Sequence, residues 1–386
     1  MIELVRFLHL SDTHLGARQY MMELREEDFY ESFREAVDIG LAEDVDFFVH
    51  SGDLFHYADP SNRALTEFKN AALRIRESGK KMYVVLGDHD RPKRVDFPAA
   101  DIFDHLNIIL LGRNGCESTT FSKNGEDITI CGISNMKGFR KAQLPEEYRK
   151  ADSIARDSAS SILISHQAIE GYLPPEECEA LKSNVPVNFS YLAFGHIHDS
   201  DIVKNGRSVF AYAGSTEMTS TREIRAYRRS GKGVNLVTIE NGKAEVKRIT
   251  LKRVRPQIEI DAREENYLEL IDSALGDKPG NNGKLPIVSL RISGKSDRIG
   301  VIGKLEELKE RAIFRKPEFI SEDRAEVEKP DDNSMKSYFA AYFKDNAELS
   351  SLAEKLYESL LNDDDERTYS AVLGYLGIGE DQSYDT

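Results

Sequence analysis

Residues 46–53 read Asp46-Phe47-Phe48-Val49-His50-Ser51-Gly52-Asp53, an apolar run that ends in a short polar cluster. The same pattern recurs through the first 217 residues. The other apolar runs, each with the polar residues that follow it, are 6–10 with 11–14, 82–86 with 87–90, 161–165 with 166, 191–194 with 195–198, and 208–213 with 214–217. Short apolar runs bounded by turn residues are typical of buried strands.

Segments of helical period lie between these runs. In residues 29–41 and 65–75 the apolar side chains recur at the spacing of one helical face. Strands that alternate with such helices predict a layered α/β fold. Ligands of such folds bind where loops leave the carboxyl ends of strands. The polar clusters are therefore the candidate functional residues.

The chain has 386 residues, which is longer than one ordinary domain. Of these residues, 40% are hydrophobic and 31% are charged. No apolar run approaches the length of a membrane span, and the first residues lack the organisation of a signal peptide. Cys116, Cys131 and Cys178 form no CxxC pair and are odd in number, which indicates reduced thiols. We therefore expect a cytoplasmic protein with no membrane partner.

The net charge of −15 is concentrated at the end of the chain. Residues 321–386 carry 17 Asp and Glu against 6 Lys and Arg, a balance of −11, which leaves −4 for the preceding 320 residues. Two bound divalent cations would cancel that remainder. The acidic total therefore does not exclude a DNA substrate, although it predicts local basic patches.

The pattern changes after residue 254. We expect strands over 257–260 and 286–292 and helices over 264–275 and 303–312, which together indicate a small separate α/β module. The predicted organisation is a layered α/β domain over 1–254, the module over 255–320, an acidic linker over 321–332, and a helical tail over 333–386. In the tail, residues 349–360 and 369–376 predict two short amphipathic helices, which dock either on this chain or on a partner.

The polar clusters contain a set of residues suited to binding metal ions. They are Asp12, His14, Asp53, Asp88, His166, His196 and His198. Phosphodiester cleavage needs an activated water and neutralisation of phosphoryl charge, which two metal ions about 3.5–4 Å apart can supply. Mixed carboxylate and imidazole ligands suit Mn²⁺, iron or Zn²⁺. A single histidine at a strand end is more often structural, but five such clusters in order favour a metal centre.

These clusters resemble the signature of the calcineurin-like metallophosphoesterases. The match narrows with residues 12–16 (DTHLG), 50–56 (HSGDLFH) and 212–217 (YAGSTE), which are similar to nucleases of the meiotic-recombination-eleven and SbcD type. That family processes DNA double-strand breaks. The specific motifs cover residues 9–217, and the later module and tail match the family in order and size.

The resemblance implies a role for each residue of the set. Asp12, His14, Asp53 and His198 would bind one metal ion, while Asp53, Asp88, His166 and His196 would bind the other, so that Asp53 bridges the pair. His89 would face the scissile phosphate and His56 would orient the DNA end. Two Mn²⁺ ions per subunit and both 3′-to-5′ exonuclease and endonuclease activity are implied.

Asp88 departs from the family pattern, which usually has Asn after the glycine of the third motif. An aspartate can coordinate a metal ion through oxygen, so we expect metal binding to be retained. The added negative charge should tighten cation binding and make the ion a weaker Lewis acid.

Two basic clusters flank the motifs. Arg91, Lys93 and Arg94 follow the third motif, and Arg222 and Arg225 follow the last. They are either solvated surface or contacts to DNA phosphates. No aromatic residues are interleaved with them, so we expect no stacking platform for single strands. His9 and His50 lie inside strands and are expected in the core or behind a metal ligand.

The resemblance also implies partners. The module over 255–320 would cap the DNA-facing side, the tail would bind the coiled-coil ABC-type ATPase of the break-repair complex, and the nuclease domains would form a homodimer at DNA ends in a prokaryotic nucleoid. Two alternatives remain open. One is a DNA-end-binding scaffold whose catalysis Asp88 has weakened, and the other is a phosphatase or phosphodiesterase for smaller substrates, which would need neither a cap nor a tail.

Overall fold

The computed structural model describes residues 4–92, 97–123, 125–276, 283–294, 296–320, 335–343, 346–361 and 365–376. Lys93, Arg94 and the predicted linker over 321–332 lie outside these ranges. Among the helices of the described ranges, none combines the length and the apolar character that crossing a bilayer requires.

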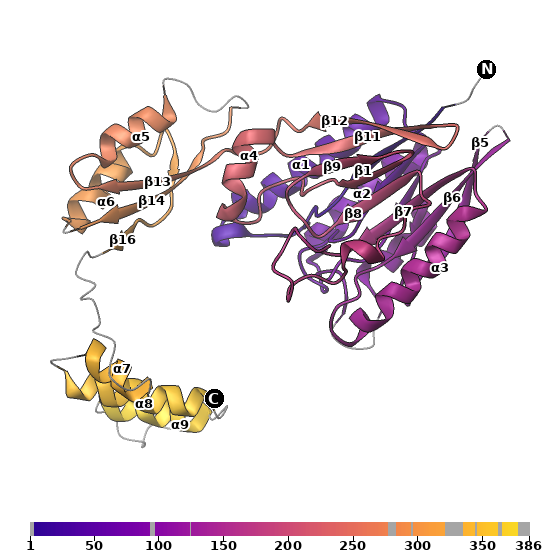
Figure 1. Ribbon diagram of the computed structural model, residues 1–386. Helices are drawn as coiled ribbons and strands as arrows, with labels where there is room; N and C mark the ends of the chain where they lie inside the picture. Colours follow the sequence, from indigo (N-terminus) through magenta and orange to yellow (C-terminus); the bar gives the residue numbers. More distant parts are fainter. Residues whose placement is uncertain are drawn as a thin grey trace. The chain divides into compact units, whose positions relative to one another are not determined.

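Two six-stranded sheets form the first part of the chain (Figure 1). The first has the order β12-β11-β1-β2-β3-β4 and the second the order β5-β6-β7-β8-β10-β9. The strands of the first sheet are β1 (Val5–Leu10), β2 (Phe47–His50), β3 (Lys81–Val84), β4 (Ile108–Leu110), β11 (Gly233–Glu240) and β12 (Lys243–Thr250). Those of the second are β5 (Glu117–Lys123), β6 (Glu126–Ile133), β7 (Ser160–His166), β8 (Tyr191–Gly195), β9 (Asp201–Asn205) and β10 (Ser208–Tyr212).

Alternating side chains of the central strands serve two different cores. Phe7 and Phe47 of the first sheet share an inner core with Ile162 and Ile164 of the second, so the sheets pack face to face. Leu8, the neighbour of Phe7, points the other way into a core beneath the helices. The central strands β1, β2, β7 and β8 read as continuous apolar runs because both of their faces are buried.

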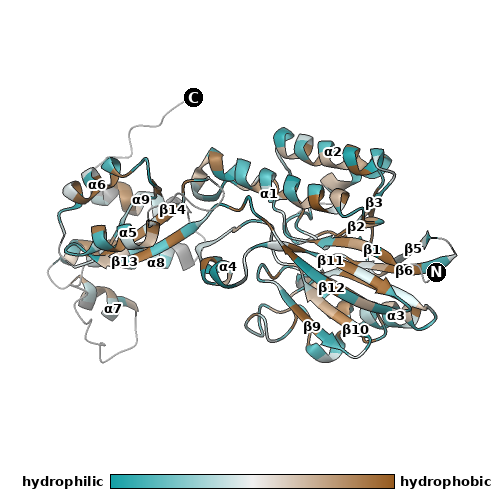
Figure 2. Ribbon diagram, turned by 90° about the horizontal axis from the view of Figure 1, so that it is seen from above, coloured by the Kyte–Doolittle hydropathy of each residue, from teal (hydrophilic) through white to brown (hydrophobic). Residues whose placement is uncertain are grey.

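Helices cover the outer faces, which completes the layered α/β sandwich predicted from the sequence. α1 (Glu23–Ala42) and α2 (Asn62–Glu77) share the outer core of the first sheet (Figure 2). α3 (Leu144–Arg156) contacts β6 and β7 of the second sheet (Figure 1). Ser61 caps α2 by accepting a hydrogen bond from the N–H of Ala64. The segment before β4 forms the 3-10 helix η2 (Ala99–Leu106).

The smaller elements follow residue 256. A third sheet contains β13 (Gln257–Arg263), β14 (Ile287–Ser293) and β15 (Ile313–Phe314), with β16 (Glu318–Ile320) paired to β14. α5 (Tyr267–Leu275) agrees with the sequence apart from its first turn, but α6 (Arg298–Glu307) begins five residues before the predicted Gly303. The helix accommodates Gly300 and Gly303, whose helix propensity is low, because Val301 and Leu305 on the same helix are buried.

The chain divides into two compact units. One comprises Met1–Ile260, Leu268–Leu290 and Gly303–Pro317, and the other Asp261–Tyr267, Arg291–Ile302 and Glu318–Thr386. Within the second unit, α8 (Ala347–Leu361) packs on both α7 (Met335–Tyr342) and α9 (Asp365–Leu376). The expectation of only two tail helices was wrong, since the aromatic segment around Phe339 forms a helix of its own that meets Tyr357 of α8.

Candidate metal centre

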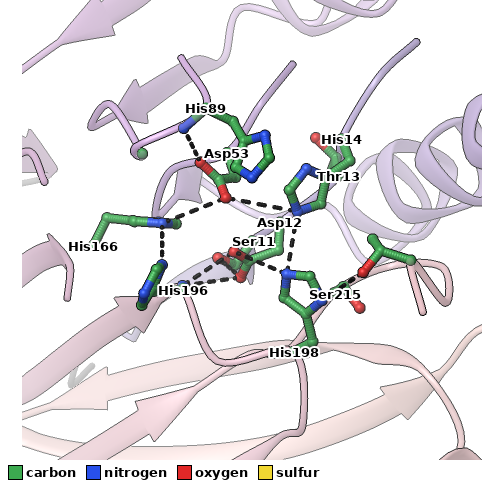
Figure 3. A network of polar contacts seen from close by, with 12 residues as sticks. Ser11, Asp12, Thr13, His14, Asp53, His89, His166, His196, His198 and Ser215 are labelled. Carbon is green, nitrogen blue, oxygen red and sulfur yellow. Dashed lines mark hydrogen bonds and ion pairs between the residues drawn. The ribbon is translucent and has the colours of Figure 1, made fainter. Parts of the chain in front are cut away.

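Strand ends from both sheets bring the predicted ligands to one place. The loops after β1, β2 and β3 carry the aspartates and His14, while β7 ends at His166 and the loop after β8 carries His196 and His198 (Figure 3). The sequence separates these residues by up to 186 positions, from Asp12 to His198. Parallel pairing of β1 with β2, of β2 with β3 and of β7 with β8 places their carboxyl ends together.

The backbone at this place is strained. Four of the predicted ligands have a positive φ, namely Asp12 (50°), His14 (43°), Asp53 (52°) and His196 (90°). Few non-glycine residues adopt this conformation, and such residues cluster at functional sites where the surrounding structure holds them. Gly87 is needed for a different reason, because a Cβ there would lie 1.9 Å from Oδ1 of Asp53. The backbone of these loops thus orients the side chains of the predicted ligands toward one another.

The seven predicted ligands form two groups that share Asp53. Asp12, His14, Asp53 and His198 make one group, and Asp53, Asp88, His166 and His196 make the other, with the possible ligand atoms of each group within 4.8 Å of one another. Oδ2 of Asp53 lies 3.6 Å from Nε2 of His14 and 3.6 Å from Nε2 of His166. A carboxylate oxygen midway between the groups has the position expected of a bridging ligand.

The separations within each group fit ligands around a common centre. Nε2 of His14 and His198 are 3.1 Å apart, and Oδ1 of Asp88 lies 3.4 Å from His166 and 3.2 Å from His196. Ligands with bonds of about 2.1 Å to one ion are separated by about 3.0–3.4 Å. Oδ1 of Asp88 is buried and makes no hydrogen bond, although two imidazoles lie close to it. A cation would satisfy it.

The protonation of the group around Asp53 is also typical of a cation site. Burial raises the pKa of Asp53 well above its usual range, and the charges of Asp88 and Asp12 raise it further against the effect of His166. Burial lowers the pKa of His166, but Asp53, Asp88 and Asp12 outweigh it and raise it to about 10. Nδ1 of His166 lies 2.8 Å from the carbonyl oxygen of Ser51, which can only accept, so Nε2 is the nitrogen that faces the carboxylates. A divalent ion would take the place of the proton there.

His89 and His56 lie beside the first group. Their rings are stacked with centroids 5.2 Å apart, and the ring of His89 meets His14 edge-on at 4.9 Å. Nδ1 of His89 donates to the carbonyl oxygen of His56 at 2.8 Å, which leaves its Nε2 for a substrate. Nδ1 of His56 lies 3.4 Å from Nδ1 of His14, so His56 also stands beside a proposed metal ligand.

Glu223 stands behind His198, and sequence reasoning missed it. Its Oε1 lies 3.1 Å from Nδ1 of His198, and its Oε2 pairs with the buried Lys232, whose ammonium also donates to Ser215. Burial raises the pKa of Glu223, but Lys232 and His198 outweigh it and hold it well below its usual range. The signal present in the sequence was the capping box that begins at Ser220, which predicts a helix start but not a partner for histidine.

Asp90 was another residue without a predicted role. Its buried carboxylate accepts hydrogen bonds from the N–H groups of Leu54, Phe55 and Gly87. It therefore ties the loop after β2, which carries Asp53, to the loop after β3, which carries Asp88.

His9 and His50 are buried as expected. His9 is hydrogen-bonded to Ser51 and Tyr191, and His50 is hydrogen-bonded to Thr13.

The basic residues named from the sequence are placed differently. Arg91 is half-buried and lines a cavity beside Asp88, whereas Arg222 and Arg225 are exposed on η5 (Thr221–Glu223) and α4 (Ile224–Ser230). The assignment of these residues to DNA, like that of the seven ligands to metal, stays a prediction.

Comparison with known proteins agrees with the geometry. The family model of the calcineurin-like phosphoesterases matches residues 5–200. The DNA double-strand break repair protein Mre11 of Thermoplasma acidophilum is 41% identical over 350 residues, which cover 90% of this chain and 92% of that protein. Proteins of the same name from Sulfurisphaera tokodaii and Methanococcus maripaludis are each 30% identical, over 97% and 95% of this chain and 98% of their own lengths. The chain therefore belongs to the calcineurin-like phosphoesterases and, within them, to the Mre11-type nucleases of DNA double-strand break repair.

Proposed function

We propose that this chain is a Mn²⁺-dependent 3′-to-5′ exonuclease and endonuclease that processes the ends of DNA breaks. The observation that carries the proposal is the position of Asp53, 3.6 Å from one histidine of each ligand group. Mixed carboxylate and imidazole groups favour Mn²⁺, iron or Zn²⁺ over Mg²⁺. When bound, two such ions would neutralise the phosphoryl oxygens and activate water.

The protein's own residues have separate tasks in this proposal. Glu223 holds the ring of His198, and the carbonyl of Ser51 holds that of His166. His89, oriented by the bond from its Nδ1 to the carbonyl of His56, would place Nε2 against the scissile phosphate. In its imidazolium form it would give the Nε2 proton to the leaving oxygen. His89 is exposed, so it can reach a substrate that His14 and Asp53, both buried, meet only through a metal ion.

The partners proposed are a coiled-coil ABC-type ATPase, a second copy of the chain and the DNA end, in the nucleoid of a prokaryotic cytoplasm. Exposed aromatic residues on the tail helices support an ATPase contact, with Tyr342 and Tyr369 each 68% exposed. Ile102 is 58% exposed on η2 and supports a helix-mediated homodimer. The module over 255–320 is proposed to cap the DNA.

Digestion of end-labelled duplex DNA with Mn²⁺ tests the proposal. We expect the 3′ label to be released early as mononucleotide and the 5′ label to give a ladder, and we expect circular single strands to be nicked. Asp53→Ala should abolish all three reactions while its thermal melt shows that it is folded. Binding of ends without cleavage would favour the scaffold reading, and turnover of phosphate monoesters alone would favour a phosphatase.

A further inference from the structure

A cavity of about 880 Å³ opens beside the proposed metal pair. Asp88 forms part of its wall, and the rest comes from three loops that include Arg91, Arg113 and Arg140. The described part of the loop after β3, the turn after β4 and the segment that follows β6 meet here. The size lies within the roughly 300–1,000 Å³ of small-molecule sites, so the cavity suits one or two nucleotides and excludes a duplex.

The charge of the cavity is positive. Arg91, Arg113, Lys137 and Arg140 line it, and Asp88 is the single carboxylate among the described residues that do so. Lys137 lies 3.5 Å from Oδ2 of Asp88, and Arg113 pairs with Asp101. Those two cations are therefore paired with carboxylates. Among the described residues, neither Arg91 nor Arg140 forms an ion pair, although the charge of Asp90 acts on Arg91.

Arg91 and Arg140 converge on one neutral acceptor. Nη2 of Arg91 donates to the carbonyl oxygen of Arg113 at 2.9 Å, and Nη1 of Arg140 donates to the same oxygen at 3.4 Å. Nε of Arg91 is buried and has no hydrogen-bond partner. Two like charges held together with an unsatisfied donor are stabilised when an anion binds between them. A phosphate has the charge and the acceptor oxygens for this position.

Aromatic rings border the same cavity. Phe139 is 83% exposed and Phe97 is 80% exposed, although both rings are large and apolar. The guanidinium of Arg140 lies 5.8 Å from the centroid of Phe139. Exposed rings beside cations are the arrangement on which nucleic-acid bases stack in single-strand sites. Because Phe139 is 48 residues from Arg91 in the sequence, this arrangement arises only in the folded chain.

These observations point to an anionic ligand with a flat aromatic group, which describes a nucleotide. We infer that the cavity is a single-strand subsite for the unpaired nucleotide next to the scissile phosphate, an inference that rests on the nuclease function proposed above. Its phosphate lies between Arg91 and Arg140, and its base stacks on Phe139. The strand end must then be unpaired before cleavage, so ends with an overhang or a frayed pair are the better substrates.

Phe139→Ala and Arg140→Ala test the subsite in the full-length chain. The probes are a duplex with a three-nucleotide 3′ overhang that carries 2-aminopurine at its terminal position, and bis(p-nitrophenyl) phosphate, a small diester that needs the metal ions but not the cavity. Each variant should raise KM for the overhang about tenfold and leave turnover of the small diester unchanged. Quenching of 2-aminopurine, measured with Ca²⁺ in place of Mn²⁺, should be lost in Phe139→Ala and retained in Phe139→Tyr. Arg149→Ala, a change on the exposed face of α3, is the matched control and should alter nothing.

The outcomes separate this inference from the proposed function. If the wild-type chain cleaves DNA and both variants cleave and quench as it does, the subsite is wrong and the nuclease stands. If the wild-type chain cleaves no DNA, the nuclease proposal fails, while the quenching still decides whether the cavity takes a nucleotide. If the variants change only the molar mass in light scattering, the cavity is a contact between protein chains and the inference is overturned.

Discussion

Oε1 of Glu223 lies 3.1 Å from Nδ1 of His198, so a buried carboxylate supports a proposed metal ligand from behind. Such partners fix the orientation of the imidazole and raise its basicity, and their loss typically costs 10–100-fold in metal affinity. We expect Glu223→Gln to raise the Kd for Mn²⁺ by about that factor, measured by isothermal titration calorimetry. Glu146→Gln on the exposed face of α3 is the control, and an equal Kd in both variants would remove Glu223 from the metal centre.

Asp88 has one carboxylate oxygen toward His166 and His196 and the other 3.5 Å from Lys137. Asp88→Asn removes the charge but keeps an oxygen ligand, so we expect Mn²⁺ to bind roughly tenfold more weakly at one of two sites. Lys137→Met should have the opposite effect, because it removes a cation that competes for the same carboxylate. Calorimetric titration of both variants and of the double variant measures the coupling. Unaltered affinity and nuclease rate in Asp88→Asn would show that the charge has no effect.

His89 is placed to act on the substrate and not to hold a metal ion. We expect His89→Ala to retain its metal content and DNA affinity near wild type and to lose cleavage, by a factor of about 10²–10⁴ if it is the general acid. Metal content is measured by plasma mass spectrometry and DNA affinity by fluorescence anisotropy. Loss of metal would instead make His89 a ligand together with His14 and His56, whose ring nitrogens lie close enough to allow it.

The buried histidines His9 and His50 predict how stability depends on pH. Burial lowers the pKa of each histidine to about 3. The charge of His50 lowers the pKa of His9 further, and the charge of His166 lowers that of His50. The unfolded chain takes up these protons near pH 6.5 while the folded chain does not, so the free energy of unfolding should fall as the pH drops from about 6.5 toward 3. The slope is up to about 1.4 kcal/mol per pH unit for each histidine. Urea denaturation at several pH values measures it, and His9→Gln should flatten the profile. A stability that is constant over this range would contradict the assignment.

Deletion of residues 333–386 separates the two proposed activities of the chain. The helices α7, α8 and α9 pack on one another, so we expect the remaining chain to fold and to retain its basal nuclease activity. Association with the ATPase, measured by size-exclusion chromatography of the mixture, should be lost. Circular dichroism of the truncated chain is the control, because an unfolded product would show that the tail belongs to the core.

Much of this architecture could be predicted from local sequence. The apolar run of residues 47–50 forms β2, whose two faces are both buried. The polar cluster that follows this run in the sequence therefore lies at the carboxyl end of the strand. The grouping of Asp12, Asp53 and His166 followed from a resemblance and from the rule that parallel strands end at one edge. The predicted start of α6 was wrong. Burial of Val301 and Leu305 stabilises the helix on both sides of Gly303, although glycine itself has a low helix propensity.

The sequence by itself determined the layered fold and the residue types of the metal centre, because burial periodicity and strand-end motifs are local properties of a chain. Only the tertiary structure decided which groups stand behind those residues. Glu223 reaches His198 across 25 positions, and Arg140 meets Arg91 at the carbonyl oxygen of Arg113 across nearly 50. No periodicity records such a contact, since it depends on how loops from different strands meet.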